Sequence, residues 1–239
     1  MRWRRACGRI AVRALPPVLG IAVASPAASQ FPPAPQARAE PAVWVSGGLG
    51  ALHAESIADG RTQTAWNMEG YTTQWHAAID VAVSRGFSLG LLGAYAQVPT
   101  NYVVTGADPA PPVSGDAPCL AAGACSATTN LVSLMVTGRL GGGRGLNQVL
   151  EFALGANQFR DIRSDDGARL APERDTDLAG SVGYGFGYGF ADDAQVALVY
   201  AFGFNAHQRD GLPGGANSLT QQRVTRLTVR FGFAERRAR

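Results

Sequence analysis

The chain has 239 residues and a formal net charge of +3, and all 21 of its basic residues are arginine. A chain of this length suits one β-domain or two small ones. Five arginines lie within the first 13 residues, which leaves 16 arginines against 18 acidic residues in the rest, a net charge of −2. The basic excess therefore belongs to the amino terminus and indicates no nucleic-acid partner.

The amino terminus predicts an exported protein. Its basic residues are Arg2, Arg4, Arg5, Arg9 and Arg13. The apolar run that follows, 14–24, is too short to cross a bilayer as a helix, which argues against the alternative of a retained membrane anchor. Small residues then allow cleavage after Ala24 or after Ser29. We predict a signal peptide at 1–29 and a Pro-rich periplasmic linker at 30–41.

The stretch Asp177–Phe190, DLAGSVGYGFGYGF, alternates between two kinds of residue. One set of alternate positions is mostly Gly, Ala and Ser, and the other is mostly aromatic and aliphatic. Successive side chains of a strand point to opposite faces, so we predict a strand with one nearly bare face. A narrow barrel explains the bare face, because its interior has little room. The two interpretations at this point are a strand of a small transmembrane barrel and a soluble Gly-rich strand or low-complexity segment.

Strand-like stretches recur along the chain and alternate with connections of two lengths. The eight predicted strands are Ala42–Leu52, Tyr71–Arg85, Phe87–Tyr95, Val132–Leu140, Leu150–Asn157, Asp177–Phe190, Gln195–Asn205 and Thr225–Phe233. The long loops are predicted at 55–70, 99–128, 160–175 and 207–221. The other connections are short turns, as on the periplasmic side of outer-membrane barrels. Both termini are therefore predicted to be periplasmic.

The predicted fold is all-β: an eight-stranded antiparallel transmembrane up-and-down β-barrel over 42–234, with a charged periplasmic tail at 235–239. The predicted lipid face carries no charge except Arg85, which lies at a turn. A charge at the membrane midplane would cost about 2–4 kcal/mol. A soluble, lipocalin-like inversion would put the charge-poor face outside, whereas soluble surfaces have roughly 25–35% charged residues. The pattern therefore favours the membrane barrel.

Aromatic residues of the predicted lipid face gather toward the strand ends, as in the interfacial girdles of membrane barrels. The predicted girdle residues are Phe87, Tyr188, Phe190, Phe231 and Phe233 on the periplasmic side, with Tyr71, Trp75, Tyr95, Phe202 and Phe204 on the outer side.

With these features the chain resembles the small eight-stranded outer-membrane barrels, the OmpA/OmpX-like and OmpW-like group. Its terminal strand LTVRFGF, 227–233, resembles the signal that the barrel-assembly machinery recognises. The resemblance implies an outer-membrane location in a Gram-negative-type cell. It also implies that outer-membrane lipid, lipopolysaccharide and the assembly machinery are partners, and that an extracellular ligand is bound through the outer loops.

Charged side chains on the inward face predict a closed lumen. Buried charges must be paired, and two acids and two bases lie toward the periplasmic strand ends: Asp80, Arg139, Glu151 and Arg230. We predict that these four form a salt-bridge cluster that plugs the lumen, and the alternative is a gate or proton path. The polar residues predicted for the upper lumen are His76, Asp177 and Arg226.

No catalytic residue, metal site or cofactor is predicted, because the sequence contains no metal-ligand spacing, phosphate loop or nucleotide-binding motif. The predicted function is that of a non-enzymatic outer-membrane barrel, structural or surface-interacting through its four outer loops. One alternative is a narrow channel or hydrophobic small-molecule conduit of the OmpW-like kind. The other is a lipid A-modifying enzyme, with His207 and Ser218 as candidate residues at the outer rim.

Cys119 and Cys125 are the cysteines that remain after removal of the signal peptide. Disulfides persist in an oxidising compartment, and the five residues between the two cysteines leave enough slack to close the bond. We predict a Cys119–Cys125 disulfide in the longest outer loop.

Overall fold

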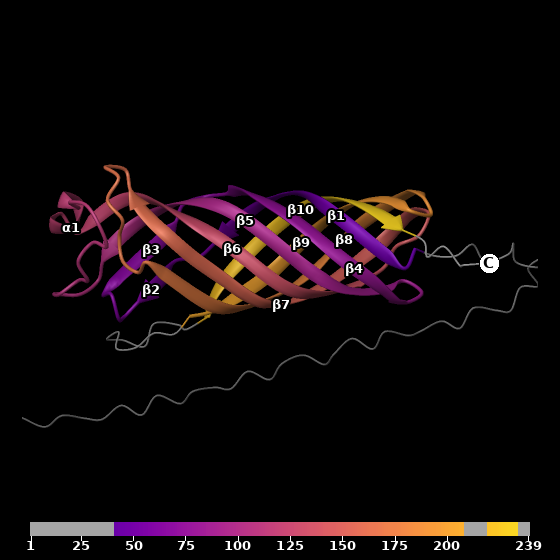
Figure 1. Cartoon of the computed structure of the whole chain (residues 1–239), viewed down its shortest axis with the longest axis horizontal. Helices are drawn as coiled ribbons and strands as arrows, with labels where there is room; N and C mark the ends of the chain where they lie inside the picture. The colour runs from indigo at the N-terminus through magenta and orange to yellow at the C-terminus, as the bar shows by residue number, and fades with distance from the viewer. Residues whose placement is uncertain (1–40, 208–218, 234–239) are drawn as a thin grey trace, which may run out of the picture. The chain divides into compact units, whose positions relative to one another are not determined.

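The computed structural model describes residues 41–207 and 219–233. Within these ranges, eight strands form a closed antiparallel barrel (Figure 1), so the predicted fold is confirmed. The barrel strands are β1 (Val43–Ala54), β4 (Thr72–Ser84), β5 (Phe87–Val104), β6 (Ala124–Leu140), β7 (Gly145–Ser164), β8 (Arg174–Ala191), β9 (Ala194–Ala206) and β10 (Leu219–Phe233). Pairing of β1 with β10, from Val43–Phe233 to Ala54–Gln222, closes the ring.

Three smaller elements lie at the end of the barrel opposite the short turns (Figure 1). They are β2 (Ile57–Asp59), β3 (Thr64–Met68) and α1 (Pro118–Ala121), and β3 pairs with the far end of β5. No helix in the described part of the chain is long and apolar enough to cross a membrane. The predicted signal peptide and charged tail, and the linker apart from Pro41, lie outside the described residues.

The strands extend further than the sequence predicted, at the end that carries the long connections. β5 continues through Pro99 to Val104, and β6 begins at Ala124, so much of the predicted loop 99–128 is a strand ladder. The predicted loop 160–175 likewise contains the end of β7 and the start of β8. β2 and β3 lie in the predicted loop 55–70, and β10 begins inside the predicted loop 207–221. These predictions were wrong because charged, polar and proline residues were interpreted as loop signals, whereas here they occupy strands that continue beyond the apolar outer face.

The outer face of the barrel carries a continuous apolar band. Large side chains on all eight barrel strands are exposed in it, including Leu49, Ile79, Leu91, Val136, Leu154, Phe186, Leu198 and Leu227. Exposed apolar surface of this extent is typical of a membrane-spanning barrel and rules out the lipocalin-like inversion. We call the part of the barrel inside this band the membrane section. The part beyond its outer edge, where Arg160, Arg174 and Arg223 face outward, is the outer section.

The interior differs between the two sections. The membrane section contains buried charged side chains and a small apolar cluster of Val149, Ala197 and Val199, whereas the outer section contains a larger hydrophobic cluster. We call this cluster the outer core; it comprises Leu52, Ala54, Ile57, Trp66, Met68, Ala96, Val98, Tyr102, Cys125, Ala127, Leu131, Phe159, Ile162, Leu170 and Val224. Trp66, Tyr102 and Phe159 are its largest fully buried side chains.

The glycines of β8 allow neighbouring strands to approach closely inside the narrow barrel. A Cβ atom on Gly185 would lie 2.0 Å from the carbonyl oxygen of Leu198 in β9, and one on Gly189 would lie 2.0 Å from that of Gly143. Neither position has room for a side chain, while Tyr184, Phe186 and the other large residues of β8 point outward. The bare face of this stretch therefore has the geometric cause that the sequence indicated.

Candidate functional sites inside the barrel

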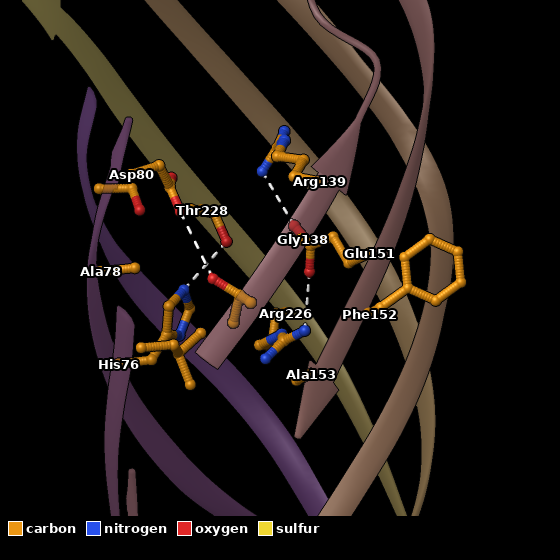
Figure 2. Close-up of a pocket in the computed structure, with 13 residues that line it drawn as sticks. His76, Ala78, Asp80, Gly138, Arg139, Glu151, Phe152, Ala153, Arg226 and Thr228 are labelled. Carbon is orange, nitrogen blue, oxygen red and sulfur yellow. Dashed lines mark hydrogen bonds and ion pairs between the residues drawn. The ribbon is translucent and has the colours of Figure 1, made fainter. Parts of the chain in front are cut away.

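An ionic cluster crosses the lumen of the membrane section, and Figure 2 labels Asp80, Arg139, Glu151 and Arg226 among its members. Its members, from four strands, are Asp80 on β4, Arg139 on β6, Glu151 on β7, and Arg226 and Arg230 on β10. Arg139 Nη1 donates to Glu151 Oε1 at 2.9 Å, and Arg226 Nη2 donates to Glu151 Oε2 at 2.7 Å. Arg230 Nη2 donates to Asp80 Oδ2 at 3.0 Å. Each carboxylate therefore joins strands that are far apart in the sequence.

The ionic cluster is buried, and neighbouring groups make further contacts with it. Arg230 Nη2 also donates to Ser88 Oγ at 2.8 Å, and the guanidinium lies 4.6 Å from the centre of the Trp44 ring. His76 Nε2 lies 2.9 Å from Thr228 Oγ1 beside the cluster. Buried charges are tolerated only with such satisfied contacts, because desolvation of each ion costs several kcal/mol.

The structure brings together all four residues that the sequence assigned to the salt-bridge cluster. The sequence grouped Arg226 with His76 and Asp177 in the upper lumen. The structure keeps Arg226 and His76 together, beside Glu151, but places Asp177 apart from them, in contact with His207. Strand position alone predicts the height of a Cα atom, whereas a long side chain that leans along its strand sets the height of its charge.

Two small cavities lie inside the membrane section. One cavity of about 30 Å³ lies beside His76, Asp80, Arg139, Glu151 and Arg226. A second, of about 20 Å³, lies further along the lumen. Volumes of this size hold one or two water molecules. An eight-stranded barrel is just wide enough for side chains to fill it.

A second polar site lies where the membrane section meets the outer section. Asp175 and Asp177 project from β8, and His207 directly follows β9. His207 Nδ1 lies 2.7 Å from Asp177 Oδ1 and 2.8 Å from Asp175 Oδ2. We call this group the Asp–His site. Burial disfavours the charged imidazolium, but the two carboxylates outweigh it and raise the pKa of His207 to about 9.

Sequence reasoning found only part of the Asp–His site. Asp177 was assigned to the upper lumen and His207 to the rim as an enzyme candidate, while Asp175 fell in a predicted loop. The signal that could have found the site is the i, i+2 spacing of the two aspartates, which puts them on one face of a strand. The approach of His207 from β9 follows only from the pairing of Leu178 with Ala206.

The geometry of His207 does not resemble that of an exposed catalytic base. The side chain is only 2% exposed, and its Nε2 atom has no hydrogen-bond partner among the described residues. Its edge-on neighbour is Trp66, with ring centres 5.9 Å apart. Ser218, the other candidate for an enzyme, lies outside the described residues.

The predicted girdle residues lie on the outer face of the barrel. Nine are well exposed, and Phe87 is partly exposed: the nine are Tyr71, Trp75, Tyr95, Tyr188, Phe190, Phe202, Phe204, Phe231 and Phe233. Aromatic residues also occur between these edges, at Tyr184, Phe186 and Tyr200. Cys125 is buried in the outer core, but the Cys119 side chain lies outside the described part, so the Cys119–Cys125 disulfide stays a prediction.

Comparisons with known proteins find similar barrels but no related sequence. No protein-family model matches the chain, and no curated protein matches it. Among solved structures, Neisserial surface protein A is similar with a TM-score of 0.48 at 8% identity, covering 80% of this chain and 97% of that one. The N-terminal β-barrel domain of Pseudomonas aeruginosa OprF is similar with a TM-score of 0.41 at 10% identity, covering 81% of this chain and 100% of that one.

The attachment invasion locus protein Ail of Yersinia pestis is also similar, with a TM-score of 0.40 at 10% identity, covering 80% of this chain and 99% of that one. Similarity at this level carries no argument about function. The assignment of the fold rests on the strand order and closure of this barrel itself, which agree with the predicted resemblance to small eight-stranded outer-membrane barrels.

Proposed function

We propose that the protein is a non-enzymatic, non-conducting outer-membrane barrel that carries a rigid platform at the cell surface. The observation that supports the proposal is that side chains cross the interior at two levels. The ionic cluster crosses the membrane section, and the outer core fills the outer section. A barrel closed in this way suits display of its outer connections better than transport through its lumen.

The apolar band supports a location in the outer membrane, because eight antiparallel strands in a closed ring satisfy every backbone group without water. In that location the band contacts the acyl chains of lipid and lipopolysaccharide. The terminal aromatic residues Phe231 and Phe233 of β10 suit recognition by the assembly machinery. An extracellular ligand, if the platform binds one, would contact the outer section and its connections.

The alternatives fit the geometry less well. A conduit for hydrophobic molecules requires an open apolar path, whereas Trp66, Phe159 and the other outer-core residues fill the interior beyond the ionic cluster. A lipid A-modifying enzyme requires a histidine that reaches lipid, whereas His207 is enclosed. The lipid A of cells with and without the protein is therefore expected to have the same mass.

The test is electrical recording from the full-length protein in planar lipid bilayers. We expect no stable conductance steps, because cavities of about 30 and 20 Å³ do not form a hydrated path. Protection of the strands from protease in the same membranes is the control, since it separates a closed barrel from a protein that has not inserted.

Reproducible, ion-selective steps from inserted wild-type protein would contradict the proposal. A silent wild-type barrel together with unchanged lipid A would support it against both alternatives.

A further inference from the structure

We propose that Asp175, Asp177 and His207 bind one divalent transition-metal cation of the Zn²⁺ type at the junction of the two sections. This inference goes beyond the proposed function, because a closed barrel does not require a metal.

The three side chains already have the arrangement of a ligand set. One oxygen from each aspartate and one nitrogen from His207 all lie within 4.8 Å of one another. Two ligands come from one face of β8 and the third from the residue that follows β9, and β8 and β9 are paired neighbours. The backbone ladder therefore fixes the spacing of the ligands before any ion binds.

A single proton does not satisfy this arrangement. His207 Nδ1 carries at most one hydrogen, and Asp177 Oδ1 accepts it. Asp175 Oδ2 is buried and lies 2.8 Å from the same Nδ1 atom, so two carboxylate oxygens share one hydrogen. A cation in the position of that proton would contact both carboxylate oxygens and the nitrogen at once. A divalent ion would satisfy both oxygens, which a single hydrogen does not.

The chemistry of the ligands selects the class of ion. Imidazole nitrogen with carboxylate oxygen suits zinc and other first-row divalent metals, whereas calcium and magnesium take oxygen ligands. Three protein ligands also leave a position for water on a four-coordinate ion. Metal–ligand distances of about 2.0–2.2 Å require the three atoms to separate slightly from their present spacing.

The surroundings hold the ligands in place. The Trp66 ring lies edge-on to the His207 ring, with 5.9 Å between centres, and it restricts rotation of the imidazole. Asp177 pairs in register with Asn157 on β7, so its backbone is held by strands on both sides of β8. Neighbouring contacts that fix a ligand orient it toward a metal and raise affinity.

The test uses the full-length protein without a polyhistidine tag, because a tag binds the same ions. The folded barrel in detergent is exposed to Zn²⁺, freed of loose ions by gel filtration and analysed for metal content. We expect one equivalent of Zn²⁺ per chain, and replacement by Co²⁺ should give visible absorption bands from nitrogen and oxygen ligation. Ca²⁺ and Mg²⁺ at the same concentration should not be retained.

His207→Gln and Asp177→Asn are expected to reduce the retained Zn²⁺ at least tenfold. His53→Gln is the matched control: it removes an imidazole whose Nδ1 atom lies in an exposed contact with the carbonyl oxygen of Gly70, and it should retain one equivalent. If Asp177→Asn does not fold, Asp175→Asn tests the same site, because that side chain is partly exposed. Wild-type protein without bound Zn²⁺ would overturn the proposal, as would full retention in folded His207→Gln protein.

Discussion

The membrane section and the outer section are built from the same strands, yet they have opposite polarity. On β5, Leu89, Leu91 and Tyr95 point outward to lipid in the membrane section, while Val98 and Tyr102 are buried inside the outer section. The same exchange occurs on β10, where Leu227 faces outward but Val224 faces inward. A continuous ladder therefore changes from an apolar exterior to an apolar interior without a break in the barrel.

The difference shows that solvent, and not strand geometry, decides which face is apolar. Side chains alternate with period two along the whole strand. In the membrane section the exterior must be apolar, because lipid cannot solvate charge, and the interior can be polar if its charges pair. In the outer section water surrounds the barrel, so the apolar residues move to the interior. The predictions below test this contrast.

The largest effect is expected from Trp66→Ala. Trp66 is fully buried in the outer core, and removal of such a side chain costs about 3–5 kcal/mol through lost burial and cavity formation. We expect increased hydrogen exchange and protease cleavage in the outer section, with the membrane section intact. Trp75→Ala is the matched control, because Trp75 is 60% exposed on the lipid face. Equal effects of the two substitutions would contradict the contrast between the sections.

An intermediate effect is expected from Leu198→Arg. Leu198 lies on the lipid face of β9 and is 55% exposed, so an arginine there would cost about 2–4 kcal/mol if it lies near the midplane. Leu219→Arg is the control on β10, because Leu219 is 57% exposed in the outer section, where water solvates the charge. Unfolding by urea in lipid vesicles measures both variants. A similar loss of stability in Leu198→Arg and Leu219→Arg would contradict the position assigned to the edge of the apolar band.

The smallest effect concerns Asp161, in the outer section. Its hydrogen bond from Arg163, at 3.0 Å, is the main cause that lowers the pKa of the carboxyl group. A lowered pKa contributes stability above the unfolded value of about 3.9, and this contribution is lost as pH falls through the folded value. Because the pair is exposed, we expect it to contribute at most about 1 kcal/mol to the free energy of unfolding.

Asp161→Asn is suited to this measurement, because residue 161 has a φ of 56°, which asparagine tolerates. The difference in unfolding free energy between wild type and Asp161→Asn should be present at pH 7 and disappear in acid. A difference in unfolding free energy that grows as pH falls would contradict this prediction.

Alternation along the chain was sufficient to predict the strand number, the closure between β1 and β10, and the lipid face. It succeeded because every outward side chain that contacts lipid in the membrane section must be apolar. This requirement does not apply at the outer end of the barrel. There Phe159, Ile162 and Trp66 lie among polar and charged residues, and local composition indicated loops where the strands continue.

The ionic cluster and the Asp–His site separate what sequence and tertiary structure each determine. The sequence by itself determined that Asp80, Arg139, Glu151 and Arg230 face the lumen, because parity along a strand assigns a face. Only the tertiary structure decided the partners, since these depend on strand stagger around the ring and on how far each side chain reaches. For the same reason, the meeting of Asp175 and Asp177 with His207 follows from the pairing of β8 with β9 and from no pattern within either strand.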